Sequence, residues 1–331
     1  MGRGASKSGP TVETIAKEAN VSIATVSRVF NRKGMVRPEL EKKILEIAEL
    51  RGFTPRQANR RDTLVLVVED IEEEAMSPYS AAIFRELIHA CAERFYRLDI
   101  LTPNELHMVR GRYVLGALGL LWNRKSIEAF EKIQFANLCA INSITSAPAV
   151  CSDEEQGMRL SLGYLIEKGH RKIGLITRDF ETYGDVNRRR AFRDYLGSSL
   201  GKGISGMELT FDGSSNDLTV TLARAFRKER PTSGNHRPTA MLATSEATGV
   251  QLMSCLDLLG IRVPDEVSIL SHESVSLTEY LLPPHTSLKQ DHRKLVETAI
   301  EIVTAASSVK KKPAMVPYQF IERDSVLELK A

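Results

Sequence analysis

Small and hydrogen-bonding side chains gather on one face of residues 22–31, near the N-terminus of the chain. If this segment is a helix, Val26, Val29 and Phe30 are buried. The other face then carries Ile23, Ala24, Thr25, Ser27 and Arg28. Hydroxyl groups can contact phosphates, and an arginine fork can bind guanine. A slim helix of this kind fits a DNA major groove about 12 Å wide. The segment is therefore a candidate base-reading helix, with a hairpin from an ordinary helical bundle as the alternative.

Two further helices are needed to position this face. The first has apolar residues at helical spacing, namely Val12, Ile15, Ala16 and Ala19. Asn20 and Val21 interrupt that pattern, and Ser22 is a suitable N-cap for the next helix. A third helix is predicted over Glu39–Gly52, with Gly52 as its stop. Three helices in this space predict a helix-turn-helix unit.

The sequence of this unit closely resembles the DNA-binding headpiece of the lactose/galactose/purine repressor family. The resemblance rests on TVETIAKEANVSIATVSRVFN at residues 11–31 and on Gly52-Phe53-Thr54-Pro55, and it covers residues 11–61. It implies a disordered arm at 1–10, a headpiece at 11–54 and a hinge at 55–62. It also implies a set of DNA contacts, which are Thr11, Ser22, Ile23, Ala24, Thr25, Ser27, Arg28, Asn31, Arg56, Arg60 and Arg61.

We expect Ile23, Ala24 and Arg28 to face bases, whereas Thr25, Ser27 and Asn31 mostly contact phosphates. The hinge departs from the family, whose leucine wedge is replaced here by Asp62. An aspartate cannot act as a wedge and is repelled by phosphates. Either the hinge does not kink DNA in the usual way, or Leu64 or an arginine takes the place of the wedge. Arg60 and Arg61 could instead enter a narrow minor groove, or simply contact phosphates.

The charge of the chain is unevenly distributed. The whole chain holds 45 Lys and Arg against 42 Asp and Glu, whereas residues 1–61 hold 13 against 6. The positive excess therefore sits on the unit that would meet DNA phosphates.

Other classes of protein find little support in the composition. The four cysteines are far apart and form neither a disulfide pattern nor a zinc motif, so we expect buried thiols in a reducing compartment. Long apolar runs and an export signal are absent, which predicts a cytoplasmic, nucleoid-associated protein without membrane contact. The common nucleotide-binding, hydrolase and metalloprotease motifs are also missing, so we expect no metal, no cofactor and no catalytic residue.

From Leu64 onward, short apolar runs alternate with amphipathic helices. Strands are predicted at Leu64–Val68, Leu98–Leu101, Gly116–Trp122, Leu138–Ile141, Lys172–Thr177, Glu208–Phe211, Thr239–Ala243, Val267–Leu270 and near Met315–Ile321. Helices are predicted at Tyr79–Arg94, Gly157–Lys168, Arg188–Leu196, Leu218–Lys228, Glu246–Leu259 and Lys289–Ala305. This alternation predicts an α/β fold with two Rossmann-like lobes and a ligand site at the carboxyl ends of the strands.

Motifs in this region extend the family resemblance to nearly the whole chain. They include Lys168-Gly169-His170 before an apolar strand, Leu259-Gly260 followed by Val263-Pro264, and Pro283-Pro284. The resemblance implies the fold of periplasmic binding proteins for an effector-binding core at 63–331. We expect an N-lobe of about 63–153 and 287–313, and a C-lobe of about 154–286 and 314–331.

The resemblance also implies effector-binding residues in the C-lobe. Arg188 occupies the place of an arginine that binds effector hydroxyls or carboxylates, although it could be a surface helix cap. Glu246 takes the place of a ligand-binding aspartate, and a charged first helical turn after an N-cap at Ser245 is the alternative. Glu273 is a candidate second ligand carboxylate. His272 beside it could bind ligand or form a packed wall.

The N-lobe contributes three further candidates. Tyr79 could stack on a ring or sugar face, or belong to the core. Trp122 and Asn123 follow a strand on the side that would face the cleft. Asp153, near the crossover between lobes, is expected to make a structural hydrogen bond.

The favoured function is a sequence-specific DNA-binding repressor that binds a pseudo-palindromic, double-stranded operator as a homodimer or higher oligomer. A small metabolite, such as a sugar, would bind between the lobes and control it. One alternative is a ligand-independent architectural DNA-binding protein, whose binding would depend on salt equally for operator and random DNA. The other is an enzyme built on the α/β core.

Overall fold

A computed structural model describes residues 11–31, 36–51, 62–70, 76–109, 114–133, 137–227, 237–305 and 312–329. The chain divides into two compact units, of which the first contains the N-terminal helices and the second begins at Leu64. In the described part of the chain, no helix has both the length and the apolar character needed to cross a membrane.

The first unit consists of α1 (Val12–Ala19), α2 (Ile23–Asn31) and α3 (Pro38–Leu50). Asn20 ends α1 in the left-handed conformation, with φ of 58°. The Ser22 hydroxyl then accepts a hydrogen bond from the backbone N–H of Thr25, at 3.1 Å. The predicted turn and the predicted N-cap are both confirmed.

The three helices share one small core. Ile15, Val26 and Ile44 are fully buried, and Val29 is nearly so. Because each helix contributes at least one of these side chains, α2 is fixed against the other two through its apolar face. The side chain of Phe30 and the predicted stop at Gly52 lie outside the described residues.

The described residues of the second unit form two six-stranded sheets, which confirms the predicted pair of lobes. The first sheet has the order β11 (Ala314–Val316), β5 (Ala149–Ser152), β4 (Leu138–Ile141), β3 (Gly116–Leu120), β1 (Thr63–Val68), β2 (Arg97–Leu101). The second has the order β12 (Gln319–Ile321), β10 (Thr286–Lys289), β9 (Ser268–Glu273), β8 (Ala240–Ala243), β6 (Lys172–Arg178), β7 (Ser205–Phe211). The central strands of both sheets run parallel, whereas β12 is antiparallel to β10.

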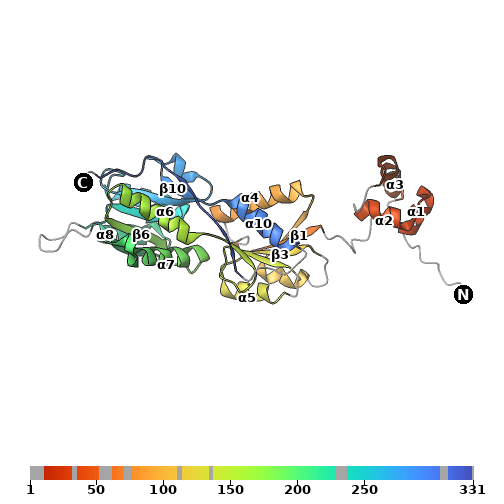
Figure 1. Ribbon diagram of the computed structural model, residues 1–331, viewed down its shortest axis with the longest axis horizontal. Helices are drawn as coiled ribbons and strands as arrows, with labels where there is room; N and C mark the ends of the chain where they lie inside the picture. The colour runs from red at the N-terminus through yellow and green to blue at the C-terminus, as the bar shows by residue number, and fades with distance from the viewer. Residues whose placement is uncertain are drawn as a thin grey trace. The chain divides into compact units, whose positions relative to one another are not determined.

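Helices cover both faces of each sheet. In the first lobe, α4 (Pro78–Glu93) and α10 (His292–Thr304) lie side by side although they are far apart in the sequence (Figure 1). The ring of Phe130 in α5 (Arg124–Glu131) packs against Gly119 of β3. In the second lobe, α6 (Glu154–Glu167) and α7 (Tyr183–Gly197) cover one face, and α8 (Ser215–Ala225) and α9 (Glu246–Leu258) cover the other.

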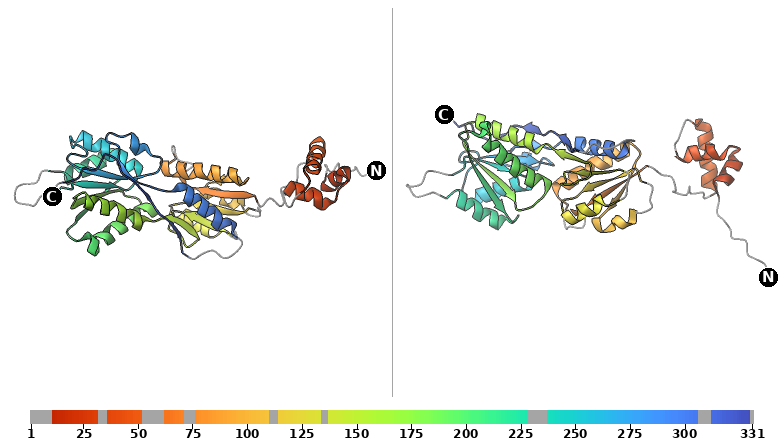
Figure 2. Two further views of the ribbon diagram at one scale, coloured as in Figure 1. Left: turned by 45° about the horizontal axis from the view of Figure 1, so that its top comes forward. Right: turned by 60° about the horizontal axis from the view of Figure 1, so that its bottom comes forward.

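The chain crosses between the lobes three times. The crossovers follow β5, follow β10, and separate β11 from β12. The last of these belongs to the dark-blue segment that runs between the lobes in Figure 2. Side chains from all three crossovers are consequently available to one region between the lobes.

This topology corrects several expectations. The single strand predicted near Met315–Ile321 is two strands in different sheets, separated by Pro317 and Tyr318. β10 belongs to the second lobe and β11 to the first, opposite to the expected boundaries at 287 and 314. The strands β5 and β10 and the helix α5 were not predicted, because each is short. The helix α7 begins at Tyr183 because the Thr182 hydroxyl caps it by accepting the Asp185 N–H at 3.2 Å.

Candidate functional sites

The exposed face of α2 carries most of the predicted DNA contacts. Ser22, Ala24, Ser27 and Arg28 are exposed, and so is 52% of the Ile23 side chain. An exposed isoleucine at the start of a helix has no role in the core of this unit, so it is available to a partner surface. Thr25 is partly buried, and its hydroxyl lies 2.9 Å from that of Ser22.

The remaining predicted contacts divide into two groups. Thr11 is exposed, and its hydroxyl caps α1 by accepting the Thr14 N–H at 3.3 Å, so it has a structural role as well. Arg56, Arg60, Arg61 and the side chain of Asn31 lie outside the described residues. Asp62, the departure in the hinge, is partly buried, and its carboxylate accepts a hydrogen bond from the Thr63 hydroxyl at 3.4 Å.

A cleft of about 530 Å³ lies between the two lobes of the second unit. Its walls come from residues at the carboxyl ends of parallel strands, where ligands bind in open α/β sheets. These residues are Asp70 after β1, Trp122 after β3, Asn142 after β4, Arg178 at the end of β6, Thr244 after β8, His272 in β9 and Gln290 after β10. The expectation of a cavity at this edge is therefore confirmed.

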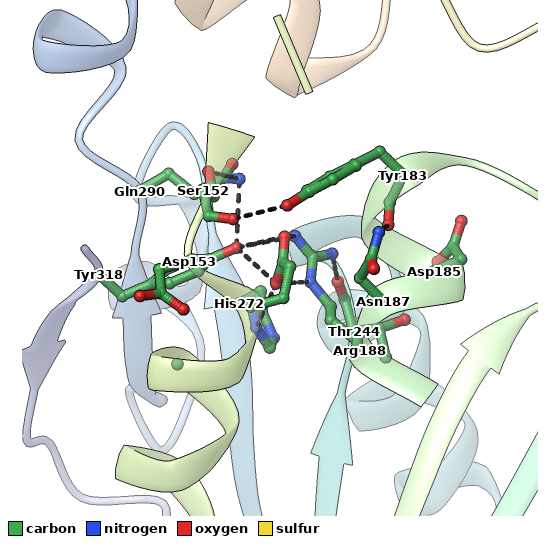
Figure 3. A network of polar contacts seen from close by, with 12 residues as sticks. Ser152, Asp153, Tyr183, Asp185, Asn187, Arg188, Thr244, His272, Gln290 and Tyr318 are labelled. Carbon is green, nitrogen blue, oxygen red and sulfur yellow. Dashed lines mark hydrogen bonds and ion pairs between the residues drawn. The ribbon is translucent and has the colours of Figure 1, made fainter. Parts of the chain in front are cut away.

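Arg188 of α7 lines this cleft and is bound by other groups of the protein (Figure 3). Its Nε donates to Glu154 Oε2 at 2.7 Å, and its Nη2 donates to Glu154 Oε1 at 3.0 Å. It also donates to the hydroxyl of Tyr318 at 2.9 Å and to the carbonyl oxygen of Thr244. Most of the guanidinium fork that would hold a ligand carboxylate is thus occupied by Glu154.

All three crossovers contribute to this network (Figure 3). Glu154 follows the first crossover, Gln290 lies in the second and Tyr318 in the third. The Tyr318 hydroxyl lies 2.9 Å from both carboxylate oxygens of Glu154, and Gln290 Nε2 lies 3.3 Å from the same hydroxyl and 3.0 Å from Ser152 Oγ. A substitution of Arg188 would therefore disturb a hydrogen-bond network to which every segment joining the two lobes contributes.

Burial controls the protonation of this network. It raises the pKa of Glu154 despite the opposing charge of Arg188. Burial also disfavours the charge on Arg188, but Glu154 and Tyr318 outweigh it and raise the pKa of the guanidinium. Burial and then Arg188 hold the pKa of His272 well below its usual value. The imidazole is neutral at physiological pH, with Nδ1 donating to the Ala243 carbonyl at 3.3 Å.

The first lobe provides two of its three predicted cleft residues. Tyr79 and Trp122 both line the cleft, and the Tyr79 hydroxyl accepts a hydrogen bond from Asn142 Nδ2 at 2.8 Å. Asn123 does not line it. The Asn123 side chain caps α5 by accepting the Lys125 N–H at 2.9 Å, which corrects the expectation of a ligand contact.

Glu246 also differs from its expected role. Its carboxylate is buried and accepts the backbone N–H groups of Val275 at 2.9 Å and Leu277 at 2.5 Å. It is absent from the cleft wall, and the neighbouring Ser245 caps α9. Glu246 therefore holds the loop that follows β9, and the N-cap alternative describes this site better.

Glu273 belongs to a separate buried network. Its carboxylate lies 2.8 Å from Arg323 Nη1 and accepts hydroxyl donors from Ser276 at 2.7 Å and Ser287 at 2.7 Å. Burial alone would raise its pKa, but Arg323 and these hydroxyls lower it to about 2. It too is absent from the cleft wall. Asp153, by contrast, makes the expected structural hydrogen bond, because it caps α6 by accepting the Gln156 N–H at 2.9 Å.

Several cleft residues were missed by the sequence analysis. They are Asp70, Asn142, Glu154, Arg178, Thr244 and Gln290. Position alone could have identified some of them, because Asp70, Asn142 and Thr244 each come one or two residues after a strand. Glu154 could not have been found in this way, because its role depends on Arg188 and Tyr318, which are distant in the sequence.

Comparisons with known proteins agree with this division into two units. A family model described as bacterial regulatory proteins, lacI family, matches residues 11–56. A second model, described as a periplasmic binding protein-like domain, matches residues 162–326. Together they cover the helical unit and most of the second lobe.

Individual proteins match over most of the chain. The HTH-type transcriptional repressor PurR of Aliivibrio salmonicida is 24% identical over 88% of this chain and 91% of its own length. The HTH-type transcriptional regulator GalR of Streptococcus thermophilus is 27% identical over 88% of this chain and 91% of its own length. Among solved structures, the Lac repressor dimer bound to operator and the anti-inducer ONPF superposes with a TM-score of 0.73, with 18% identity over 97% of this chain and 100% of that one. The complex of the transcriptional regulator CelR with cellobiose superposes with a TM-score of 0.63, with 22% identity over 96% of this chain and 99% of that one.

Proposed function

Because the chain belongs to the lacI family of bacterial regulatory proteins and is a DNA-binding transcriptional regulator, we propose that it represses transcription as a homodimer on a pseudo-palindromic operator. We further propose that a small metabolite in the interlobe cleft controls this binding. The observation that carries the proposal is the combination, in one chain, of an exposed small-residue helix face and a large polar cleft. In this proposal the protein works in the cytoplasm, on the nucleoid.

The exposed face of α2 supports a direct reading of bases. Ile23, Ala24 and Arg28 have no partner in the core of the unit, and the guanidinium of Arg28 is suited to guanine. Thr25 and Ser27, together with Thr11, Ser22 and Asn31, would contact phosphates and fix the register. Arg56, Arg60 and Arg61 would add phosphate or minor-groove contacts.

A patch of exposed apolar side chains on the second lobe supports the homodimer. It surrounds η4 (Leu277–Tyr280), where Tyr280 is 77% exposed and Leu282 is 86% exposed. Val275 and Leu277 are also exposed beside them. A soluble protein rarely leaves such a patch uncovered. A second copy would cover it and would place two headpieces on two half-sites.

Control by a metabolite follows from the position of the cleft. Its wall contains residues of both lobes, so a bound molecule would contact both and favour one arrangement of the lobes over another. Such a rearrangement in a dimer would change the spacing of the two headpieces and shift the population that binds DNA.

The test is fluorescence anisotropy with the full chain, a selected operator library and random DNA at one salt concentration. We expect a specificity ratio of roughly a thousand or more, altered by one compound of a metabolite panel. Arg28→Ala should cost about 1–3 kcal/mol at one base pair of each half-site. Arg190→Ala, which removes the same charge from an exposed position of α7, is the matched control and should change nothing.

Equal affinity for operator and random DNA would overturn the repressor proposal and favour architectural binding. A second measurement, sedimentation of wild type and Tyr280→Glu, examines the homodimer. The variant should sediment as a monomer, and an unchanged dimer would show that the patch around η4 is not the interface.

A further inference from the structure

Asp70 is a buried carboxylate without a counter-charge in the described structure. It follows β1, lines the cleft and is only 1% exposed. Its Oδ2 accepts the backbone N–H of Ser77 at 3.1 Å, which also positions the first turn of α4. Its Oδ1 has no hydrogen-bond partner among the described residues. Burial of an unpaired charge is costly, so this oxygen needs a donor from elsewhere.

Among the described residues, the part of the cleft wall that the first lobe contributes around Asp70 supplies no cation. The other cleft residues contributed by the first lobe are Ser77, Tyr79, Leu120, Leu121, Trp122, Ile141 and Asn142. All of them are neutral. The two arginines in the cleft wall belong to the second lobe, and one of these, Arg188, is already paired with Glu154.

Among the described residues, three further atoms of the cleft wall have no hydrogen-bond partner, and all three belong to the second lobe. The Nε2 of His272 is an acceptor because Nδ1 carries the proton, and Glu154 Oε2 lies 4.0 Å from it. The hydroxyl of Thr244 can accept or donate, whereas the Nε of Arg178 can only donate. A molecule that satisfies these atoms and Asp70 must therefore donate at least two hydrogen bonds, one of them to a carboxylate, and accept at least one.

The charge of the whole wall points in the same direction. It contains the carboxylates of Asp70, Glu154, Glu181 and Asp185 against the guanidinium groups of Arg178 and Arg188. The acidic excess favours a positively charged occupant. The aromatic rings of Tyr79 and Trp122 lie in the same part of the wall, and such rings also stabilise cations.

We propose that the effector is a hydroxylated amine, such as an amino sugar, whose ammonium group binds Asp70. This inference rests on the proposed function, because it identifies the class of molecule that would occupy the regulatory cleft. The ammonium supplies the missing counter-charge at Oδ1. Hydroxyl groups of the same molecule donate to His272 Nε2 and Thr244 Oγ1, so the ligand bridges the two lobes.

Matched pairs of sugars provide the test. Isothermal titration calorimetry of the full chain at neutral pH would compare glucosamine with glucose, galactosamine with galactose and mannosamine with mannose. Each pair differs by an ammonium in place of one hydroxyl. We expect one amino sugar to bind roughly 10- to 100-fold more tightly than its hydroxyl counterpart, as is typical of hydrogen bonds between charged groups. N-acetylation of that sugar should abolish the preference.

Asp70→Asn assigns the preference to the carboxylate. The amide keeps an oxygen for the Ser77 N–H, so the start of α4 should be preserved. The variant should lose the 10- to 100-fold preference for the ammonium and bind the neutral sugar as before. Asp257→Asn, which removes the same charge from an exposed position of α9, is the matched control and should keep the preference.

Three results would overturn this inference. One is equal or weaker binding of every amino sugar relative to its neutral counterpart, and another is an ammonium preference that survives Asp70→Asn. The third is that none of the six sugars binds, which would suggest that Asp70 is neutralised within the protein, for example by Arg178 of the opposite wall. None of these results would affect operator specificity, which the anisotropy experiment measures separately, so the proposed function and this inference can fail independently.

Discussion

Two buried carboxylates of the second lobe are each paired with an arginine, but their surroundings differ. Glu273 lies 2.8 Å from Arg323 and receives additional hydroxyl donors, and these partners lower its pKa to about 2. Glu154 lies 2.7 Å from Arg188 at the cleft, and there burial prevails and raises its pKa. The same pair of functional groups thus holds an ionised carboxylate firmly at Glu273, whereas at Glu154 the ionised form is less favoured.

The difference has a physical origin in the number of donors. The partners of Glu273 all belong to strands and loops of a single lobe, so the network remains complete whatever the cleft contains. The Glu154 network joins α6, α7 and the crossovers, and it lies where a ligand could compete for Arg188. We therefore expect the first pair to control stability and the second to control the response to an effector.

The largest effect is expected for Arg323→Ala. This change removes the closer of the two cations beside the buried carboxylate of Glu273 and leaves only Lys289, whose Nζ lies 3.8 Å away. Breaking a buried ion pair typically costs about 3–5 kcal/mol. Urea unfolding followed by circular dichroism would measure the loss. A cost below about 1 kcal/mol would mean that Lys289 and the hydroxyl donors can hold the ionised carboxylate without Arg323, and the proposed division between the two pairs would fail.

The next largest effect is expected from acid, which should lower the free energy of unfolding through His285, a neighbour of the Glu273–Arg323 pair. Burial, aided by Arg323, lowers the pKa of His285 from 6.5 to about 4. As the pH falls through this window, the unfolded chain binds a proton that the folded chain excludes. The contribution of His285 to the free energy of unfolding is therefore fully present above pH 6.5. It is lost as the pH falls toward 4, by at most about 3 kcal/mol. His285→Gln should show a shallower decline in urea unfolding across the same window, and an unchanged slope would assign it to other groups.

A smaller cost is expected for Arg188→Met, about 1–3 kcal/mol. Its partner Glu154 already has a raised pKa, so without the guanidinium it can accept a proton and become neutral. The cost should diminish as the pH falls toward the pKa of Glu154, because the unpaired charge then disappears. A cost equal to that of Arg323→Ala at every pH would show that the two pairs are equivalent.

The smallest effect is expected for Glu246→Gln. Its carboxylate accepts backbone N–H groups but has no arginine partner among the described residues, and the amide retains one acceptor oxygen. We expect a loss of about 1 kcal/mol in unfolding free energy and an unchanged response to effector. A loss of effector response without a loss of stability would return Glu246 to the ligand-binding role that the sequence suggested.

The architecture and the position of the cleft were largely predictable from the sequence, but most of the residues that line the cleft were not. Apolar runs such as Leu64–Val68 identified most of the strands, because a strand covered on both faces must be apolar throughout. Short elements such as β5 and α5 carried too little pattern to be recognised. The strand predicted near Met315–Ile321 failed for a different reason, since an apolar run does not reveal that the chain changes sheets at Pro317 and Tyr318.

The sequence by itself determined the helical unit and the edge of the sheets where the cleft would lie. The contacts that build α1 to α3 are local, and the carboxyl end of a parallel strand follows directly from its limits. Only the tertiary structure decided which carboxylates face the cleft. Glu154 is held by Tyr318, which is 164 residues away, whereas Glu246 and Glu273 face inward toward protein donors. A carboxylate is available to a ligand only if donors of the protein do not already bind it. Those donors come from distant parts of the chain.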